Sequence, residues 1–307
     1  MVWRIPPGII PNLLTPMTSS LDVDEHKLRQ LVDFHIGCDV TGSLCIGVHL
    51  AQSHNLSLEE RKKIAKIIVE QTRGRKGTMV SVASASLRES IELARHAVDI
   101  GADAVIAVPP YFRNLTQDDL FDFYSTLAKS IPISVIAYHL PSWQAGIGLG
   151  PELVVRLASQ FENFVGIKDA SFSLEYHSEL VSQVRRAKLD FEVSLSLEWI
   201  VPSFPIGPRS AHSGLVAVAP NLTSRLFKAA LAQDWVRARN LFDDFGRLWS
   251  IIYAGFPGSL NSAMALMGRS LGPLRPPLEP LSLEADEELR IALEELGLFS
   301  AEPFGWC

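Results

Sequence analysis

Residues 165–171 read Val165-Gly166-Ile167-Lys168-Asp169-Ala170-Ser171, a short apolar run that ends in a single amine. A run of this length between turn-like segments is typical of a buried strand in a parallel sheet. At the end of such a strand the Lys168 ammonium loses hydration, which lowers its pKa. A neutral amine can attack a ketone and form an imine, so Lys168 is a candidate covalent catalyst. The alternative is a structural lysine that extends to solvent or pairs with Asp169 or Glu198.

Short apolar runs of this kind alternate with longer amphipathic segments along the whole chain. The predicted strands are Ile9–Leu14, Gly42–Ile46, Thr78–Ala83, Ala104–Val108, Ile133–Ala137, Val165–Lys168, Phe191–Ser196 and Gly214–Ala219. The predicted helices between and after them are Asp24–Gly37, Ser57–Thr72, Ser86–Ile100, Asp118–Ser130, Pro151–Phe161, Ser173–Lys188, roughly Glu198–Ile206, and Asn221–Gln233. Eight strand–helix repeats predict an α/β fold, the TIM (β/α)8 barrel. An open doubly wound sheet would need a glycine-rich phosphate turn after its first strand, and residues 11–16 do not form one.

Sequence patterns typical of helix starts support the predicted barrel helices. Further helices are predicted after the barrel. Ser57 and Ser86 each stand three residues before a glutamate, which predicts a capping box at both helix starts. From Trp235 onward the sequence predicts added helices at Trp235–Ile252, Ser259–Met267 and Ala285–Leu296. We therefore expect a barrel of residues 1–233 and a C-terminal helical extension of residues 234–307 that packs on it.

Composition narrows the possible functions. The chain has 307 residues, of which 47% are hydrophobic, and a barrel of about 250 residues leaves room for the added helices. A formal net charge of −6 without a basic block does not favour nucleic acid or an anionic membrane surface. No signal-peptide pattern or membrane-length apolar stretch is visible, and the three cysteines are scattered, so we expect a cytoplasmic protein. No His, Asp and Glu cluster stands at the strand ends, so we expect neither a metal nor a cofactor, and a metal-dependent aldolase is not favoured.

Barrel enzymes build their sites where strands end and loops begin. Tyr138 ends the predicted strand next to that of Lys168, so both side chains can face one cavity. A phenol beside a lysine can carry protons through imine formation and C–C bond cleavage. The alternative is a core tyrosine whose hydroxyl is hydrogen-bonded to the backbone. His139 follows Tyr138 and should point away from it, because side chains alternate along a strand. His212 precedes the predicted eighth strand and is expected in a loop.

Motifs in the same order as in a known enzyme family run along nearly the whole chain. They are Leu14-Thr15-Pro16, Leu58-Glu59-Glu60-Arg61, Gly101-Ala102-Asp103-Ala104, Pro109-Pro110-Tyr111-Phe112, Tyr138-His139-Leu140-Pro141, Gly166-Ile167-Lys168-Asp169-Ala170-Ser171, Gly214-Leu215-Val216-Ala217-Val218-Ala219-Pro220-Asn221 and Arg275-Pro276-Pro277-Leu278. In order and spacing they resemble the dihydrodipicolinate synthase/N-acetylneuraminate lyase family of class I aldolases. The resemblance implies that Lys168 forms an imine with pyruvate or another 2-oxo acid and that Tyr138 is the general acid/base. It also implies an aldehyde partner and a homotetramer, often a dimer of dimers.

The loop after the second strand departs from the family. The family usually shows Gly-Thr-Thr-Gly-Glu or Gly-Ser-Thr-Gly-Glu there, whose hydroxyls and amides hold the 2-oxo acid carboxylate. This chain reads Gly47-Val48-His49-Leu50-Ala51-Gln52, so both hydroxyls are missing. Because imidazole can donate to a carboxylate and titrates near neutrality, we hypothesise that His49 takes over carboxylate binding or proton relay. The alternative is a histidine on a rearranged loop that faces a subunit interface.

Two further departures concern the second substrate. Phe112 stands where the synthases use a tyrosine for proton relay, and Trp143 stands where they carry an arginine. Losing a guanidinium removes a bidentate carboxylate contact, and an indole adds apolar stacking surface. We therefore expect an apolar or aromatic aldehyde, and neither the diaminopimelate-pathway reaction nor a sialic-acid lyase. The alternative for Trp143 is that its side chain packs on a neighbouring subunit. Further candidate substrate-binding or orienting residues at strand ends are Thr15, Ser196 and Val216.

Three functions stay open at this point. The first is a Schiff-base lyase or aldolase, and the second is a 2-keto-3-deoxy acid dehydratase that uses the same imine to eliminate water. The third is an inactive barrel that serves as a binding or scaffold protein, which the altered Gly47–Gln52 loop keeps open. The retained Lys168 and Tyr138 argue against the third, because an idle buried amine only lowers stability. The sequence does not name the substrate.

Overall fold

The computed structural model describes residues 2–112, 114–143, 146 and 148–306. The chain forms two compact units. Unit 1 contains the residues up to Ile10, Gly42–Ile46 and Lys76–His212, and unit 2 contains Pro11–Thr41, Gly47–Arg75 and the residues from Ser213 onward. The predicted boundary between residues 233 and 234 stays a prediction.

Within the described residues, eight parallel strands form a nearly closed barrel in the order β1-β8-β7-β6-β5-β4-β3-β2. They are β1 (Gly8–Pro11), β2 (Ser43–Ile46), β3 (Gly77–Ser81), β4 (Ala104–Ala107), β5 (Ser134–His139), β6 (Phe164–Asp169), β7 (Glu192–Ser196) and β8 (Ser210–Ser213). The Gly42 amide donates to the Ile9 carbonyl at 2.8 Å and so links β1 to the start of β2. The TIM-barrel prediction is confirmed.

Burial explains why these segments are strands. All residues of β4, β5 and β6 are buried, as expected for parallel strands that are covered on both faces. Gly166 in β6 allows a close approach, because a Cβ there would lie 2.7 Å from Ile5 Cδ1 and 2.9 Å from the Glu192 carbonyl. The N-terminal Ile5, itself 3% exposed, therefore packs directly on the strand that carries Lys168.

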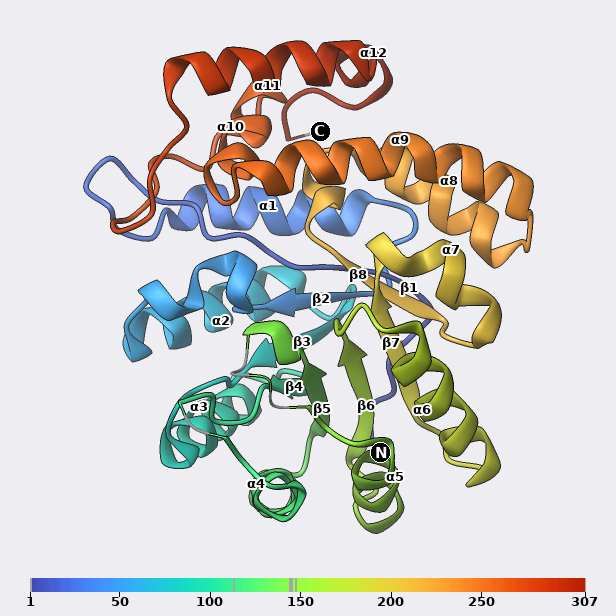
Figure 1. The fold of residues 1–307 in the computed structure, drawn as a ribbon. Helices are drawn as coiled ribbons and strands as arrows, with labels where there is room; N and C mark the ends of the chain where they lie inside the picture. The colour runs from blue at the N-terminus through green and yellow to red at the C-terminus, as the bar shows by residue number, and fades with distance from the viewer. Residues whose placement is uncertain (1, 113, 144–145, 147, 307) are drawn as a thin grey trace. The chain divides into compact units, whose positions relative to one another are not determined.

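The helices of unit 1 follow the strands in sequence, and consecutive ones pack on each other. They are α3 (Leu87–Asp99), α4 (Gln117–Ser130), α5 (Pro151–Gln160), α6 (Leu174–Arg186) and the short α7 (Ile200–Ser203). In Figure 1, α3 to α6 lie around the outside of strands β3 to β7. Thr116 begins α4 with a capping box to Asp119, which helps to fix the end of the loop that follows β4.

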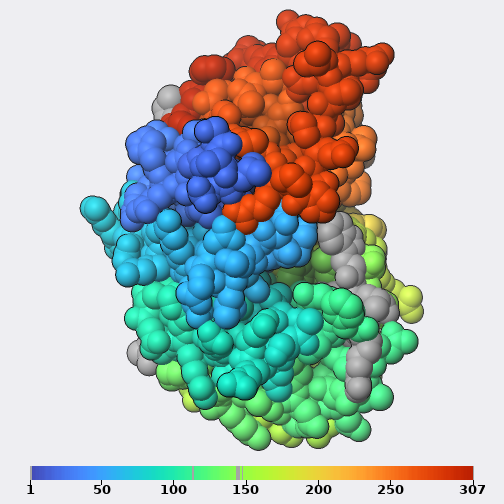
Figure 2. Space-filling view, turned by 90° about the vertical axis from the view of Figure 1, so that its left-hand side faces the viewer, coloured from blue at the N-terminus to red at the C-terminus, as the bar shows by residue number. Residues whose placement is uncertain are grey.

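The helices of unit 2 include the predicted C-terminal additions. They are α1 (Glu25–Gly37), α2 (Leu58–Thr72), α8 (Pro220–Leu231), α9 (Trp235–Ala254), α10 (Gly258–Leu266), α11 (Leu283–Glu295) and α12 (Leu298–Ala301). α1 packs on α2, α8 packs on α9, and α10 packs on both α9 and α11. The C-terminal residues, orange and red in Figure 2, form one continuous surface. The added helices after Trp235 are thus confirmed.

Two local predictions are wrong, and a third, the seventh helix, is correct in position but is not one continuous α-helix. The eighth strand is Ser210–Ser213 rather than Gly214–Ala219, and the apolar run instead forms a 3-10 turn, η6 (Leu215–Ala217), before Pro220 opens α8. The seventh helix is broken into η4 (Leu197–Trp199), α7 and η5 (Phe204–Ile206), because Pro202 and Pro205 interrupt it. Ser86 makes no side-chain cap, since Glu89 accepts from the Ser84 hydroxyl at 2.6 Å.

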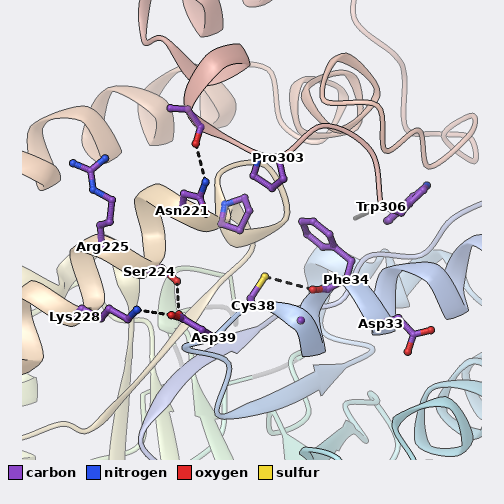
Figure 3. Close-up of a pocket in the computed structure, with 13 residues that line it drawn as sticks. Asp33, Phe34, Cys38, Asp39, Asn221, Ser224, Arg225, Lys228, Pro303 and Trp306 are labelled. Carbon is purple, nitrogen blue, oxygen red and sulfur yellow. Dashed lines mark hydrogen bonds and ion pairs between the residues drawn. The ribbon is translucent and has the colours of Figure 1, made fainter.

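Unit 2 has a cavity of about 650 Å³ lined by α1, α8 and the C-terminal tail (Figure 3). Its polar end holds Asp39, which accepts from Lys228 and from the Ser224 hydroxyl. Its apolar end is formed by Phe34, Pro303 and Trp306. None of the predicted site residues lines this cavity. No helix in the described part of the chain is long and apolar enough to cross a membrane.

Candidate active site

Lys168 lies near the end of β6 and is 2% exposed, so it does not extend to solvent. In the strand register Lys168 pairs with Tyr138 of β5 on one side and with Ser194 of β7 on the other. The Lys168 Nζ lies 4.2 Å from the centre of the Tyr138 ring, which is itself 4% exposed. The structure thus brings together the two residues that the sequence proposed for catalysis.

Burial sets the charge state of this amine. Desolvation lowers the pKa of Lys168 from 10.5 to about 8, and the nearby Cys45 and Glu198 offset only part of that effect. At pH 7 this change increases the neutral, nucleophilic fraction of the amine by about 300-fold. Desolvation likewise raises the pKa of Glu198 from 4.5 to about 7, although the lysine charge opposes the rise. Burial therefore moves the pKa values of Lys168 and Glu198 toward neutrality, as is common for groups in active sites.

The backbone of Tyr138 is held in place by a second tyrosine. The Tyr124 hydroxyl on α4 donates to the Ala107 carbonyl of β4 at 2.8 Å and also shares a hydrogen bond with the Tyr138 backbone. Tyr124 is fully buried, and burial raises the pKa of its phenol far above the usual value. This phenol therefore stays neutral and links the ends of β4 and β5, which fixes the point from which the Tyr138 ring projects.

Two further residues near Lys168 were not predicted from sequence. His212 was expected in a loop, but it lies on β8 and is 1% exposed; that prediction is wrong. Burial and the charge of Lys168 hold the pKa of His212 well below 6.5, so its imidazole is neutral. Cys45 on β2 is fully buried, and burial raises its pKa to about 11. Glu198, by contrast, was considered in the sequence only as a pairing partner for Lys168.

The predicted carboxylate-binding loop belongs to unit 2. Gly47 has a φ of 73°, a left-handed conformation that favours glycine, and Val48 after it is buried. His49 opens a 3-10 turn, η1 (His49–Ala51), in place of the usual hydroxyl-bearing turn. The Thr15 hydroxyl donates to the Ala51 carbonyl at 2.7 Å, so it helps to fix this loop. Their roles toward a substrate stay predictions.

The other residues predicted to bind substrate are Ser196, Val216, Phe112 and Trp143. Ser196 ends β7 and pairs in register with His212, and Val216 is buried in η6 of unit 2. Phe112 is 87% exposed in the loop after β4. The backbone of Trp143 ends the turn η3 (Pro141–Trp143). Its side chain is not among those that the structure describes, so the predicted role of the indole stays a prediction. Among the described residues, no three His, Cys, Asp or Glu side chains are grouped so as to hold a metal ion.

Comparison with known sequences gives the family. The sequence model of the dihydrodipicolinate synthetase family matches residues 6–296. The chain belongs to this family. It is 31% identical over 294 residues to a 4-hydroxy-tetrahydrodipicolinate synthase of Methanopyrus kandleri, which covers 95% of this chain and 96% of that protein. The family resemblance inferred from the sequence is thereby confirmed.

Solved structures agree with this assignment. A chloride-inhibited dihydrodipicolinate synthase of Acinetobacter baumannii, solved with pyruvate, superposes with a TM-score of 0.87 at 29% identity over 96% of this chain and 100% of its own. YagE, a prophage member of the family from E. coli K12 also solved with pyruvate, gives a TM-score of 0.87 at 26% identity over 95% of this chain and 99% of its own. As a dihydrodipicolinate synthetase family member, the chain is a Schiff-base-forming lyase of the aldolase type. The dehydratase and the inactive scaffold gain no support from these comparisons.

Proposed function

We propose that Lys168 captures the keto carbon of pyruvate and that Tyr138 moves the protons. The amine attacks C2, water leaves as the imine forms, and loss of a C3 proton gives an enamine whose carbon attacks the aldehyde. In the cleavage direction the same bonds break in reverse order. The observation that carries this proposal is the buried amine, whose pKa is about 8, lying 4.2 Å from the Tyr138 ring centre.

We propose an apolar or aromatic aldehyde as the second substrate. Two of the relatives named above are a 4-hydroxy-tetrahydrodipicolinate synthase and a dihydrodipicolinate synthase, but Phe112 and Trp143 replace two polar family positions in this chain. An indole offers stacking surface where a guanidinium would pair with a carboxylate. The family resemblance and these two residues support the proposal.

Turnover with a panel of aldehydes tests this substrate. Pyruvate is incubated with pairs of aldehydes of equal length, one ending in a carboxylate and the other in a phenyl or alkyl group, and product is measured by mass spectrometry in both directions. The proposal requires a higher kcat/KM for the uncharged member of each pair. A consistent preference for the carboxylate member would contradict it and favour the reaction of the named relatives.

We propose that His49 binds the carboxylate of the 2-oxo acid in place of the missing hydroxyls. His49→Ala should raise the KM for pyruvate by about tenfold or more, since a hydrogen bond to a charged group contributes about 1.5–3 kcal/mol. The value of kcat should change much less. His54→Ala is the matched control, because His54 is an exposed histidine in the following turn, η2 (Ser53–Asn55). An unchanged KM in His49→Ala would return His49 to a structural role.

The charge of Glu198 should set the pH at which Lys168 becomes nucleophilic. Glu198 raises the pKa of Lys168, so Glu198→Gln, which has the same size but no charge, should lower that pKa. The rising limb of the pH profile for imine formation should then move down by about one pH unit. The measurement is the second-order rate constant of borohydride trapping with pyruvate, which reports the free enzyme. A limb that stays in place would show that the two groups do not interact.

We propose further that the enzyme is a cytoplasmic homotetramer. The family resemblance supports the assembly. The absence of paired cysteine motifs from the sequence fits a reducing compartment. Sedimentation equilibrium should give the mass of four chains; the mass of a single chain would contradict the assembly.

A further inference from the structure

The residues that follow Tyr138 and Lys168 form a second register pair, His139 with Asp169. Because side chains alternate along a strand, this pair faces away from the side to which Tyr138 and Lys168 point. Both residues are nevertheless buried, with 3% of His139 and 7% of Asp169 exposed. A polar pair that is buried directly behind two catalytic candidates needs partners, and α6 supplies them.

Asp169 is bound on both carboxylate oxygens. Oδ1 accepts from the Ser171 amide at 3.0 Å, and Oδ2 lies 3.0 Å from Nδ1 of His177 on α6. Only 3% of the His177 side chain is exposed, so this hydrogen bond is shielded from water. A carboxylate can only accept, which assigns the proton to Nδ1. The other nitrogen, Nε2, is buried without a hydrogen-bond partner among the described residues.

His139 is held by α6 and by the segment that precedes α5. Its Nδ1 accepts from the Leu149 amide at 3.1 Å, and burial lowers its pKa to about 4, so the ring is neutral. The ring stacks on Tyr176 with 4.1 Å between centroids and 18° between planes. Tyr176 precedes His177 on α6. One turn of α6 therefore contacts β5 through a ring stack and β6 through a hydrogen bond.

We infer that Asp169 and His177 are positioning residues for Lys168, an inference that rests on the proposed role of that lysine. The hydrogen bond between them fixes the rotation of the end of β6, and the Ala170 amide, which donates to the His139 carbonyl at 2.8 Å, extends the ladder past it. A rotation of about 10° at the strand end would move the nitrogen of an extended lysine by roughly 1 Å, enough to slow a reaction by about a hundredfold.

The test replaces His177 by two amide side chains of different length. His177→Asn places an amide nitrogen at the position of Nδ1, and His177→Gln places it near Nε2, while His177→Leu removes the Nδ1 donor at similar volume. The readouts are the borohydride trapping rate at saturating pyruvate, kcat, KM and the thermal unfolding midpoint. We expect trapping and kcat to fall by about ten- to a hundredfold in the Gln and Leu variants and to stay within about threefold of wild type in the Asn variant.

Tyr176→Phe, at the neighbouring position on α6, is the matched control. Its hydroxyl is buried without a described hydrogen-bond partner, so its removal should leave both the His139 stack and the trapping rate unchanged. If the Leu variant fails to fold, the Asn and Gln pair still decides. Equal trapping in Asn and Gln variants, or wild-type trapping in either the Gln or the Leu variant, would overturn the inference. A wild-type protein that pyruvate does not trap on Lys168 would instead overturn the proposed role of the lysine, and the inference with it.

Discussion

Lys168→Ala should abolish both turnover and adduct formation while the protein still folds. Without the amine no imine can form, and the neighbouring side chains offer no replacement nucleophile, since burial raises the pKa of Cys45 to about 11 and keeps its thiol protonated. Folding should persist because the substitution removes a desolvated polar group from the barrel interior. Turnover, trapping with pyruvate and borohydride, and circular dichroism measure the three parts of this expectation.

Two comparison variants make the Lys168 result specific. Lys168→Arg keeps a cation at the position, but its pKa above about 12 prevents nucleophilic attack, so it should be as inactive as the alanine variant. Lys129→Ala removes an exposed lysine of the same unit and should leave trapping unchanged. Any adduct that survives in Lys168→Ala at the wild-type rate would move the chemistry to another amine.

Tyr138→Phe should slow turnover by about a hundredfold or more, as expected for the loss of a general acid/base. The variant keeps the ring that lies 4.2 Å from the Lys168 amine, so packing and amine burial are preserved and only the hydroxyl is lost. The measurement is kcat together with the rate of imine formation, which separates proton transfer from access to the lysine. A kcat within about threefold of wild type would remove Tyr138 from the proton path.

Much of the barrel could be predicted from sequence because apolarity and burial coincide in seven of its strands. β8 escaped prediction because its residues, Ser210–Ser213, are small or polar. All four are buried, and the Ser210 hydroxyl donates to Glu192 on β7 at 2.8 Å, a contact between two strands that the local sequence does not show. The eighth strand was predicted instead at the more apolar run Gly214–Ala219, although Pro220 directly after it marks the start of a helix.

Part of the candidate site could also be predicted from the sequence, and part of it could not. Lys168 and Tyr138 could be paired from sequence, since consecutive parallel strands predict neighbouring ends. The groups that tune the lysine, Cys45 and Glu198, come from β2 and from the turn after β7, and only the barrel brings them near it. His177 falls inside the predicted helix Ser173–Lys188, but nothing in the local sequence showed that it would meet Asp169.

Mapping the borohydride-reduced pyruvate adduct to a single residue would show whether Lys168 is the amine that forms the imine. The protein is incubated with pyruvate, reduced, digested and sequenced by mass spectrometry, with untreated and pyruvate-free samples run in parallel. We expect one modified peptide, the one that contains Lys168. An adduct confined to another lysine, or no adduct with pyruvate or any other 2-oxo acid, would contradict it.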